Sequence, residues 1–447
     1  MDHLFRFAEA PAFGYGFTEA KRGNRVGTFN SLSDIVSNGY CIGCGLCAAV
    51  APAARIEMRK AAHGHLRPHP TTPLGRDEEA RILATCPGIK VTGPEAQDAD
   101  FDAVWGTARL VARGHATDPD LRFRASSGGI MTAVNRQLLE SGEIAFVLQG
   151  APDHDDPFGS VAQICRQPDD LMRAGGSRYG SAATLRSIIY VLDLGEPFAV
   201  SMKPCDIAGL RNLQREDARA RDLIRFTQAM FCGTVPSLAA IRGFFARRGH
   251  DLDREDPAGF RWRGNGCPGP TVATMKDGRV LQGTYNELWN ENTWTTQFRC
   301  KVCPDAVGLQ ADLAVGDDWP GATPEGEDEG WNALIAHTEG GERIVRACAE
   351  AGTIAIHDVD VRYLDEVQPH HVRLRRGLLS RLEGCRDAGL PDPNFTRLAL
   401  EDCAAPLSAE ERVQIREGTR RRLKRGHGDD DAVADFGTAM GEMMRME

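Results

Sequence analysis

The sequence predicts a mixed α/β protein in which a small cysteine-rich domain precedes an α/β body and a charged helical tail. The 447 residues are 42% apolar and 26% charged and include 48 glycines, a composition typical of globular α/β proteins. From about residue 105, short apolar runs alternate with segments of helical periodicity. Most of the closely spaced cysteines lie before that point, in residues 41–86.

The first half of the body alternates strands and helices. We expect strands at 101–114, 143–150 and 197–205, and helices at 126–142, 181–195 and 206–217. Ile130, Val134 and Leu138 recur every four residues, as on one face of a helix, and Ser141-Gly142 ends that helix. Asp206 is a natural N-cap for the last of these helices.

The second half continues the alternation. A helix is expected at 237–249 and a hairpin at 271–283, which turns at Asp277-Gly278. Further strands are expected at 311–319, 332–338 and 353–360, with a helix at 342–352. The tail from about Leu407 is rich in charged residues and is expected to be helical.

Composition and charge exclude several classes of protein. The net charge of −10 argues against a nucleic-acid binder. No apolar run approaches the roughly 20 residues that span a bilayer, and the N-terminus lacks a basic start followed by an apolar core. We therefore expect a cytoplasmic protein with no membrane span, where thirteen cysteines indicate metal or redox chemistry rather than disulfides.

The first cysteine group begins like a bacterial ferredoxin. Cys41, Cys44 and Cys47 keep the spacing of the iron–sulfur run C-x₂-C-x₂-C-x₃-C-P, but Ala51 stands where the fourth cysteine belongs. Cys86 is followed by its own proline, and we predict that it fills the vacancy. The four cysteines then hold a [4Fe–4S] cluster, and the alternative is a zinc site with the same ligands.

The second cysteine group is less specific when taken alone. Cys300 and Cys303 form a CxxC, which fits zinc, a redox disulfide or a cluster equally well. Cys205 ends an expected strand, Cys232 lies beside a glycine, and Cys267 is a rival ligand.

A set of segments, taken in order, resembles the coenzyme F-420 hydrogenase/dehydrogenase beta-subunit family. The segments are CIGCGLC…TCPG, SSGG, GSRY, KPCDIAGLRNL, FCG, CxxCPD and ADLAVGDDW, within about residues 38–375. The resemblance implies FAD and one or two [4Fe–4S] clusters, the second of them held by Cys205, Cys232, Cys300 and Cys303. It also implies a division into a ferredoxin-like domain (1–95), a flavin-binding domain (96–225), a C-terminal domain with the second cluster (226–400) and a helical tail (401–447).

The resemblance places the flavin on two short segments. These are SSGG and GSRY, with Ser126, Ser127, Gly128, Gly129, Gly176, Ser177, Arg178 and Tyr179. The residues themselves agree, because SSGG precedes a helix whose free N–H groups suit a diphosphate, although a simple helix cap explains the same pattern. Arg178 pairs with a phosphate or, alternatively, forms a surface salt bridge. Asp317 and Asp318 are expected to hold the cluster loop, contact a flavin edge or cap their strand.

The function expected from this combination is an electron relay. In the first reading, a ferredoxin-like donor loads the clusters, and FAD passes electron pairs to a small organic substrate. In the second, the chain is a subunit that joins a partner oxidoreductase subunit to a deazaflavin coenzyme. A third reading from another class is a zinc-stabilised binding module without redox activity. The sequence does not identify the substrate.

Overall fold

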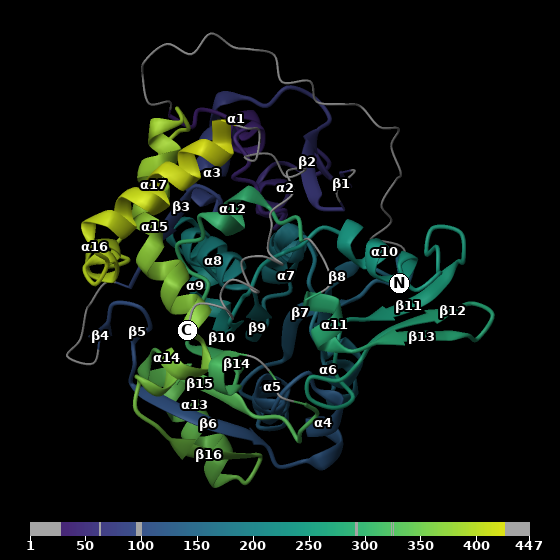
Figure 1. The fold of residues 1–447 in the computed structure, drawn as a ribbon. Helices are drawn as coiled ribbons and strands as arrows, with labels where there is room; N and C mark the ends of the chain where they lie inside the picture. The colour runs from purple at the N-terminus through teal and green to yellow at the C-terminus, as the bar shows by residue number, and fades with distance from the viewer. Residues whose placement is uncertain are drawn as a thin grey trace.

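An eight-stranded mixed sheet forms the centre of the protein (Figure 1). The computed structural model describes residues 28–61, 64–94, 101–290, 294–322, 324 and 326–424. Across the sheet the strand order is β16 (Ile354–Asp358), β6 (Leu110–Ala116), β15 (Asn332–Ala336), β14 (Leu313–Asp317), β10 (Ile224–Met230), β9 (Phe198–Met202), β7 (Phe146–Pro152) and β8 (Ser160–Cys165). The run β14-β10-β9-β7 is parallel, and the other neighbours are antiparallel.

Helices cover both faces of this sheet. Successive strand residues point to opposite faces, so Phe146 and Leu148 belong to one core and Val147 to the other. The Val147 core is closed by α5 (Ile130–Glu140), α6 (Pro168–Ala174) and α13 (Glu339–Glu350). The Phe146 core is closed by α7 (Ile188–Asp193) and α8 (Pro204–Glu216), together with the N-terminal residues.

The N-terminal module packs on the α7–α8 side of the sheet. It contains α1 (Leu32–Ser37), α2 (Leu46–Val50), β1 (Ile56–Lys60), β2 (Leu66–Pro70), α3 (Arg76–Thr85) and β3 (Lys90–Thr92). β1 and β2 form an antiparallel hairpin, while β3 pairs in parallel with β17 (Asn394–Thr396) from the far end of the chain. The module is therefore joined to the body by a shared core and by a strand pair.

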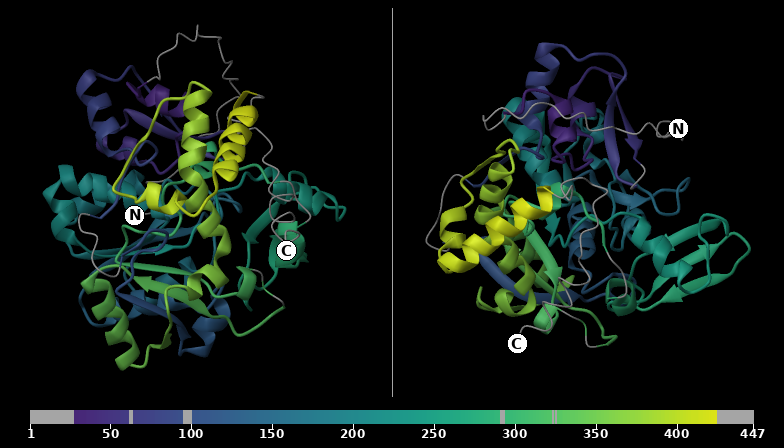
Figure 2. Two further views of the ribbon diagram at one scale, coloured as in Figure 1. Left: turned by 60° about the vertical axis from the view of Figure 1, so that its left-hand side comes forward. Right: turned by 45° about the horizontal axis from the view of Figure 1, so that its top comes forward.

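The C-terminal helices lie beside this module (Figure 2). They are α15 (Pro369–Asp387), α16 (Leu400–Ala404) and α17 (Ala409–Lys424), whereas the short α14 (Tyr363–Val367) precedes α15 near β15 (Figure 1). The charged tail thus forms helices over its described part, and α17 packs along α15 with Gly384 close to the Arg416 carbonyl. Residues 425–447 lie outside the described residues.

A small three-stranded sheet stands to one side of the body (Figure 1). Its strands are β11 (Pro257–Arg261), β12 (Thr271–Met275) and β13 (Val280–Gly283), packed with α10 (Ala239–Ala246) and α11 (Tyr285–Asn290) around an aromatic core. The predicted hairpin at Asp277-Gly278 is confirmed as the β12–β13 connection. The remaining short elements are β4 (Phe101–Asp102), β5 (Gly106–Thr107), α4 (Pro119–Arg124), η1 (Thr184–Ser187), α9 (Ala218–Leu223), α12 (Phe298–Lys301) and η2 (Pro320–Ala322).

Most predicted elements are present, with four differences. The strand predicted at 101–114 is divided into β4, β5 and β6, and the helix predicted at 181–195 is divided into η1 and α7. Asp206 is not an N-cap, because Pro204 occupies the first position of α8 and starts the helix two residues earlier, with Lys203 as the N-cap. The sheet itself crosses position 225, where the sequence suggested a domain boundary, because β6 pairs with β15 and β9 with β10.

No helix within the described residues combines the length and apolar character needed to cross a bilayer.

Candidate functional site

In the first cysteine group, Cys41 and Cys44 lie in the loop before α2, Cys47 lies within α2, and Cys86 lies at the end of α3. Gly43 and Gly45 take positive φ angles of 70° and 82°, a conformation that favours glycine, and Gly45 is the N-cap of α2. A side chain at Gly43 would place its Cβ 2.6 Å from the Leu66 carbonyl oxygen. The two glycines therefore let the cysteine loop curl against its neighbours. Cys86 follows directly as the C-cap of α3.

The structure brings all four predicted cysteines of this group together. Burial raises the pKa of Cys44, and Asp206, Cys86 and Cys47 raise it further. Burial also raises the pKa of Cys47, to which Cys41 and Cys86 add, and it raises the pKa of Cys86 to about 12 with a contribution from Cys41. Each sulfur thus interacts electrostatically with others of the group, although Cys86 is distant in sequence.

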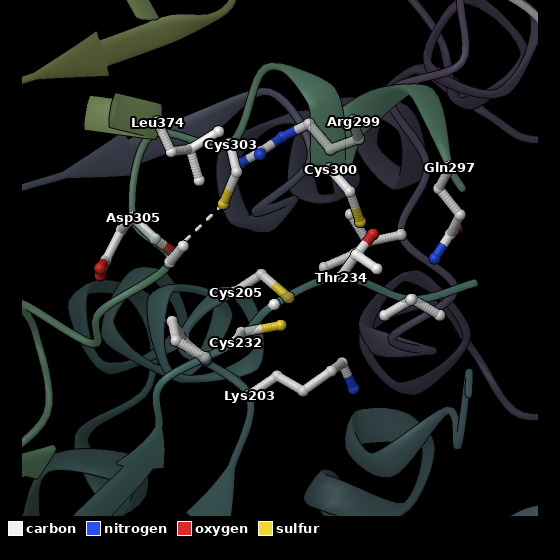
Figure 3. Close-up of a pocket in the computed structure, with 15 residues that line it drawn as sticks. Lys203, Cys205, Cys232, Thr234, Gln297, Arg299, Cys300, Cys303, Asp305 and Leu374 are labelled. Carbon is white, nitrogen blue, oxygen red and sulfur yellow. Dashed lines mark hydrogen bonds between the residues drawn. The ribbon is translucent and has the colours of Figure 1, made fainter. Parts of the chain in front are cut away.

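The second cysteine group lines a small pocket in the body (Figure 3). Cys205 lies in the first turn of α8, Cys232 follows β10, and Cys300 and Cys303 lie in and just after α12. Figure 3 shows the four sulfur atoms pointing toward one space, with Lys203 at its edge. Three segments that are far apart in the sequence therefore present thiols to the same pocket.

Burial dominates the protonation of these thiols as well. It raises the pKa of Cys205, Cys232 and Cys303, and neighbouring cysteines of the group raise each of them further. Lys203 acts in the opposite direction on Cys205 and Cys232, and Arg299 does so on Cys303. Since metals bind the thiolate, these cations favour the form of the cysteine that serves as a ligand.

Four thiols can hold either a single metal ion or an iron–sulfur cluster. Among the residues that the structure describes, no three His, Cys, Asp or Glu side chains are set to hold one metal ion. In a zinc site four thiolates converge on one ion at about 2.3 Å, whereas in a cubane each thiolate binds a different iron. The [4Fe–4S] clusters, with zinc as the alternative, therefore stay a prediction from the sequence.

The other cysteines lie elsewhere. Cys267 is 2% exposed, and the groups that act on its thiol are Asp317, Arg263, Asp328 and Trp319, not the pocket cysteines. Cys165, Cys348, Cys385 and Cys403 are buried, and Cys348 packs in the core as the sequence predicted. Cys267 is therefore not among the residues that line the pocket of the second group.

Two further side chains fix the Cys86 loop to the body. The guanidinium of Arg299, a residue that is 1% exposed, donates to the carbonyl oxygens of Gly88 (2.7 Å) and Pro87 (3.1 Å). The Asn212 amide on α8 donates to the carbonyls of Thr85 and Lys90. Nothing in the sequence distinguishes this arginine and this asparagine from surface residues, so neither role was predicted.

The two segments predicted to contact a flavin also meet. The amide of Ser177 donates to Oγ of Ser126 at 2.8 Å, which joins GSRY to SSGG. The rest of SSGG is occupied by the protein itself, because Ser127 Oγ donates to the Trp331 carbonyl and a Cβ at Gly128 would lie 2.8 Å from the Asn332 amide. Packing alone therefore requires a glycine at position 128.

The start of α5 already has a capping side chain. Gly129 is its N-cap with a φ of 80°, and the Ile130 amide donates to Oδ1 of Asn332 at 3.2 Å. This bond removes one of the free N–H groups that the sequence offered to a diphosphate.

Arg178 and Tyr179 serve the protein's own packing. Arg178 donates to Ser160 Oγ and to the Gly159 carbonyl, and burial lowers its pKa to about 10. The Tyr179 ring packs edge-on against Trp262 and Trp289 in the aromatic core of the small sheet. The alternative of a surface salt bridge for Arg178 is therefore not what the structure shows.

Asp317 and Asp318 hold two separate ion pairs rather than a cysteine loop. Asp317 accepts hydrogen bonds from both terminal nitrogens of Arg263, at 2.8 and 3.0 Å. Arg263 is 1% exposed, and its Nε is buried without a hydrogen-bond partner. Asp318 accepts from Arg113 Nε (2.8 Å) and from the Tyr363 hydroxyl (2.5 Å). The ion-pair partners come from segments that are remote in the sequence and were not predicted, and a contact of Asp317 or Asp318 with a flavin edge or cluster loop stays a prediction.

Curated relatives are oxidoreductases or their subunits. The chain is 23% identical over 320 residues to a coenzyme F420-dependent sulfite reductase of Methanocaldococcus jannaschii, covering 71% of this chain and 47% of that protein. It is 24% identical over 243 residues to the F420-dependent formate dehydrogenase 1 subunit beta of Methanococcus maripaludis, covering 54% and 59%. The chain thus spans less than two thirds of either relative. Against the coenzyme F420 hydrogenase subunit beta of Methanococcus voltae, it is 22% identical over 300 residues, covering 65% and 99%.

A solved chain of the F420-reducing [NiFe] hydrogenase complex from Methanosarcina barkeri matches with a TM-score of 0.45 and 19% identity, covering 62% of this chain and 94% of that one. Two family profiles match adjoining parts of the sequence. Residues 111–189 match the N-terminal part of the coenzyme F420 hydrogenase/dehydrogenase beta subunit, and residues 195–362 match its C-terminal part. The chain therefore belongs to the coenzyme F420 hydrogenase/dehydrogenase beta-subunit family.

Proposed function

We propose that the chain is an electron-transfer subunit of an oxidoreductase complex that exchanges electrons with a deazaflavin coenzyme. Two [4Fe–4S] clusters are its one-electron carriers, one on Cys41, Cys44, Cys47 and Cys86, and the other on Cys205, Cys232, Cys300 and Cys303. The observation that carries the proposal is the meeting of the second group in one pocket, from three separate segments, beside Lys203 and Arg299.

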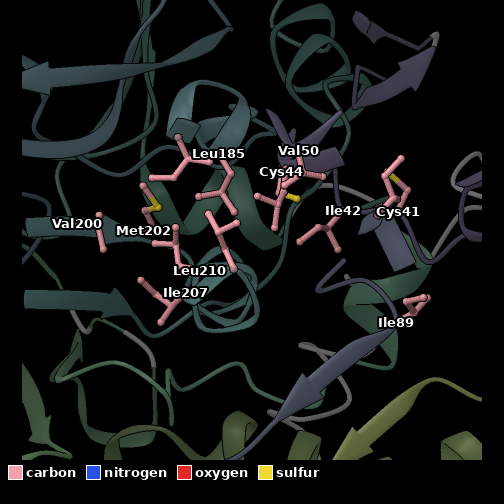
Figure 4. Close-up of a cluster of buried hydrophobic side chains, with 14 of the residues drawn as sticks. Cys41, Ile42, Cys44, Val50, Ile89, Leu185, Val200, Met202, Ile207 and Leu210 are labelled. Carbon is pink, nitrogen blue, oxygen red and sulfur yellow. The ribbon is translucent and has the colours of Figure 1, made fainter. Parts of the chain in front are cut away.

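The residues around the first group suit a cluster. Cys44 lies in the shared core among Ile42, Val50 and Leu185 (Figure 4), and all four are buried. Such apolar surroundings exclude water, and the potential of an iron–sulfur cluster depends on its exposure and on nearby charges. When bound, the clusters supply one-electron exchange, while the protein holds the thiolates and keeps the space between them dry.

FAD is the proposed two-electron carrier, since a flavin bridges one- and two-electron chemistry. The contact between Ser126 and Ser177 supports a flavin at the SSGG and GSRY segments, as does the buried Nε of Arg263, whose terminal nitrogen also donates to the Ser126 carbonyl. The Asn332 cap on α5 opposes a diphosphate at that helix start. FAD therefore rests mainly on the family resemblance.

The relatives favour the subunit reading over a self-contained reductase. The hydrogenase beta subunit is covered along 99% of its length, and the formate dehydrogenase relative is also named a subunit beta. One observation favours the second candidate, a reductase of an organic substrate fed by ferredoxin. The N-terminal cysteine module shares its core with the body, so an entry point for single electrons lies within the same chain.

One experiment separates these readings. The chain is purified anaerobically, reduced, and mixed in turn with an oxidised deazaflavin coenzyme and with oxidised ferredoxin. The proposal expects rapid bleaching of the deazaflavin absorbance by the reduced chain. Exchange with ferredoxin alone supports the reductase, and a colourless chain that contains zinc but no iron supports the binding module.

A further inference from the structure

A buried ion pair lies at the start of α8, next to both cysteine groups. Asp206 is 0% exposed, and its Oδ2 accepts a hydrogen bond from Lys203 Nζ at 2.6 Å. Its other oxygen, Oδ1, is buried and has no hydrogen-bond partner. A buried carboxylate is costly unless it is fully paired, so this half-satisfied residue requires an explanation beyond stability.

Asp206 acts on a cysteine of each group. It directly follows Cys205 of the second group in the first turn of α8, and its carboxylate adds to the rise that burial causes in the pKa of both the Cys205 thiol and the Cys44 thiol of the first group. A chain of contacts follows the same route, because Thr184 Oγ1 lies 3.5 Å from Asp206 Oδ2 and the next amide, that of Leu185, donates to the Cys44 carbonyl at 2.9 Å. One carboxylate is therefore linked to both groups, by chain adjacency to Cys205 and by the Thr184–Leu185 contacts to Cys44.

Lys203, the other member of the ion pair, lies beside the second cysteine group only. It lines the pocket beside Cys205 and Cys232 of the second group, where its ammonium opposes the rise that burial causes in the pKa of both thiols. The Cys44 thiol instead feels Asp206, Cys86 and Cys47. The Asp206 carboxylate thus acts on both cysteine groups, and the Lys203 ammonium offsets its negative charge at the second group.

We propose that the negative charge of Asp206 tunes the reduction potentials of both cysteine sites for electron transfer between them. Lys203 offsets that charge at the second site. This inference rests on the proposed function. The step it governs is a one-electron exchange, in which the first site is oxidised by one electron, the second is reduced by that electron, and no bond is made or broken.

The sign of the effect follows from electrostatics. A negative charge near a redox centre disfavours the added electron and lowers the potential, and the effect is strong where water is excluded. Asp206→Asn should therefore raise both potentials. In the double variant Asp206→Asn/Lys203→Met the first site loses only a negative charge, whereas the second loses one charge of each sign.

The test is a redox titration followed by electron paramagnetic resonance, which reports the two sites as separate signals. We expect Asp206→Asn to favour reduction of each site by about tenfold, or about 59 mV for a one-electron couple. The double variant should keep that shift at the first site and lose most of it at the second. Asp312→Asn is the control, because this carboxylate bonds Thr227 and Thr338 instead, and it should leave both potentials unchanged.

The double variant also tests the proposal if the single variant Asp206→Asn fails to fold. Replacing both members of a buried pair by neutral residues is better tolerated than removing one, so the double variant decides the matter if Asp206→Asn does not fold. Unchanged potentials, or a shift at the second site alone, would overturn the shared role. Loss of iron from the double variant, with Asp312→Asn fully loaded, would assign Asp206 a structural role only. A wild-type chain without clusters refutes the proposed function itself and is recognised before any variant is made.

Discussion

Arg299 and Gly88 join the two cysteine-bearing loops of this protein. Nε of Arg299 donates to the Gly88 carbonyl at 2.7 Å, and a second nitrogen of the same guanidinium donates to the Pro87 carbonyl. Arg299 immediately precedes Cys300, and Pro87 immediately follows Cys86. A single buried side chain therefore fixes one loop of the N-terminal module against one loop of the body.

We predict that Arg299→Leu destabilises the protein and lowers its iron content. The substitution leaves two carbonyls without their donor, and each such loss costs about 1–3 kcal/mol. The free energy of unfolding should fall by about 2–5 kcal/mol in urea titrations. Arg299→Lys should recover only part of it, since lysine lacks the planar fork that reaches two acceptors.

Arg254→Leu is the matched control for this prediction, because the Arg254 side chain is 87% exposed. It should leave both the unfolding curve and the iron content unchanged. An Arg299→Leu chain with wild-type stability would contradict the joining role.

Cys86→Ser should lose the N-terminal cluster as completely as Cys44→Ser. The two thiols interact electrostatically although α3 and the β1–β2 hairpin separate them in sequence. Iron and sulfide analysis of the two variants, with the spectrum of the second cluster as an internal reference, measures the loss. A Cys86→Ser chain with its full iron content would show that another residue fills the place of Ala51.

The fold was predictable where local pattern decides it. The apolar periodicity of Ile130, Val134 and Leu138 gave α5, and Asp277-Gly278 gave the β12–β13 turn. The strand order was not predictable, because the pairing of β6 with β15 joins segments more than two hundred residues apart. Neighbours in such a sheet are chosen by tertiary packing, which leaves no local signature in the sequence.

Ser126→Ala should lower the flavin-to-iron ratio of the purified chain by about two- to tenfold, because it removes the hydrogen bond that joins SSGG to GSRY. Thermal stability should change little. Flavin fluorescence after acid release, divided by iron, gives the ratio.

Gly128→Ala is the comparison for stability. Its Cβ meets the Asn332 amide and the Gly114 carbonyl oxygen at 2.8 Å, so overpacking should cost about 1–3 kcal/mol with or without a flavin. A wild-type flavin-to-iron ratio in Ser126→Ala removes this segment from the flavin site.

The cysteine groups illustrate the limit of sequence reasoning at a site. The spacing alone predicted that Cys41, Cys44 and Cys47 form one group, because they lie on successive turns of one loop. The second group came from a family resemblance, since Cys205 and Cys232 have no local pattern. Lys203 and Arg299 were missed because a buried, paired cation looks like a surface cation in the sequence.

Cys232→Ser should lower the iron content while the N-terminal cluster signal remains. Cys232 lines the second pocket and interacts with Cys300 and Cys303. Cys267→Ser is the matched control, since Cys267 is equally a buried cysteine but lies beside Arg263 and Asp317. Equal iron loss in the two variants would show that the second ligand set is wrong.

The most direct test of the two-cluster account is the iron and acid-labile sulfide content of the anaerobically purified wild-type chain. Two cubanes, each with four irons and four sulfides, predict about eight of each per chain, together with two electron paramagnetic resonance signals on reduction. About four of each would leave only one group occupied. A chain with zinc and no labile sulfide would contradict the account altogether.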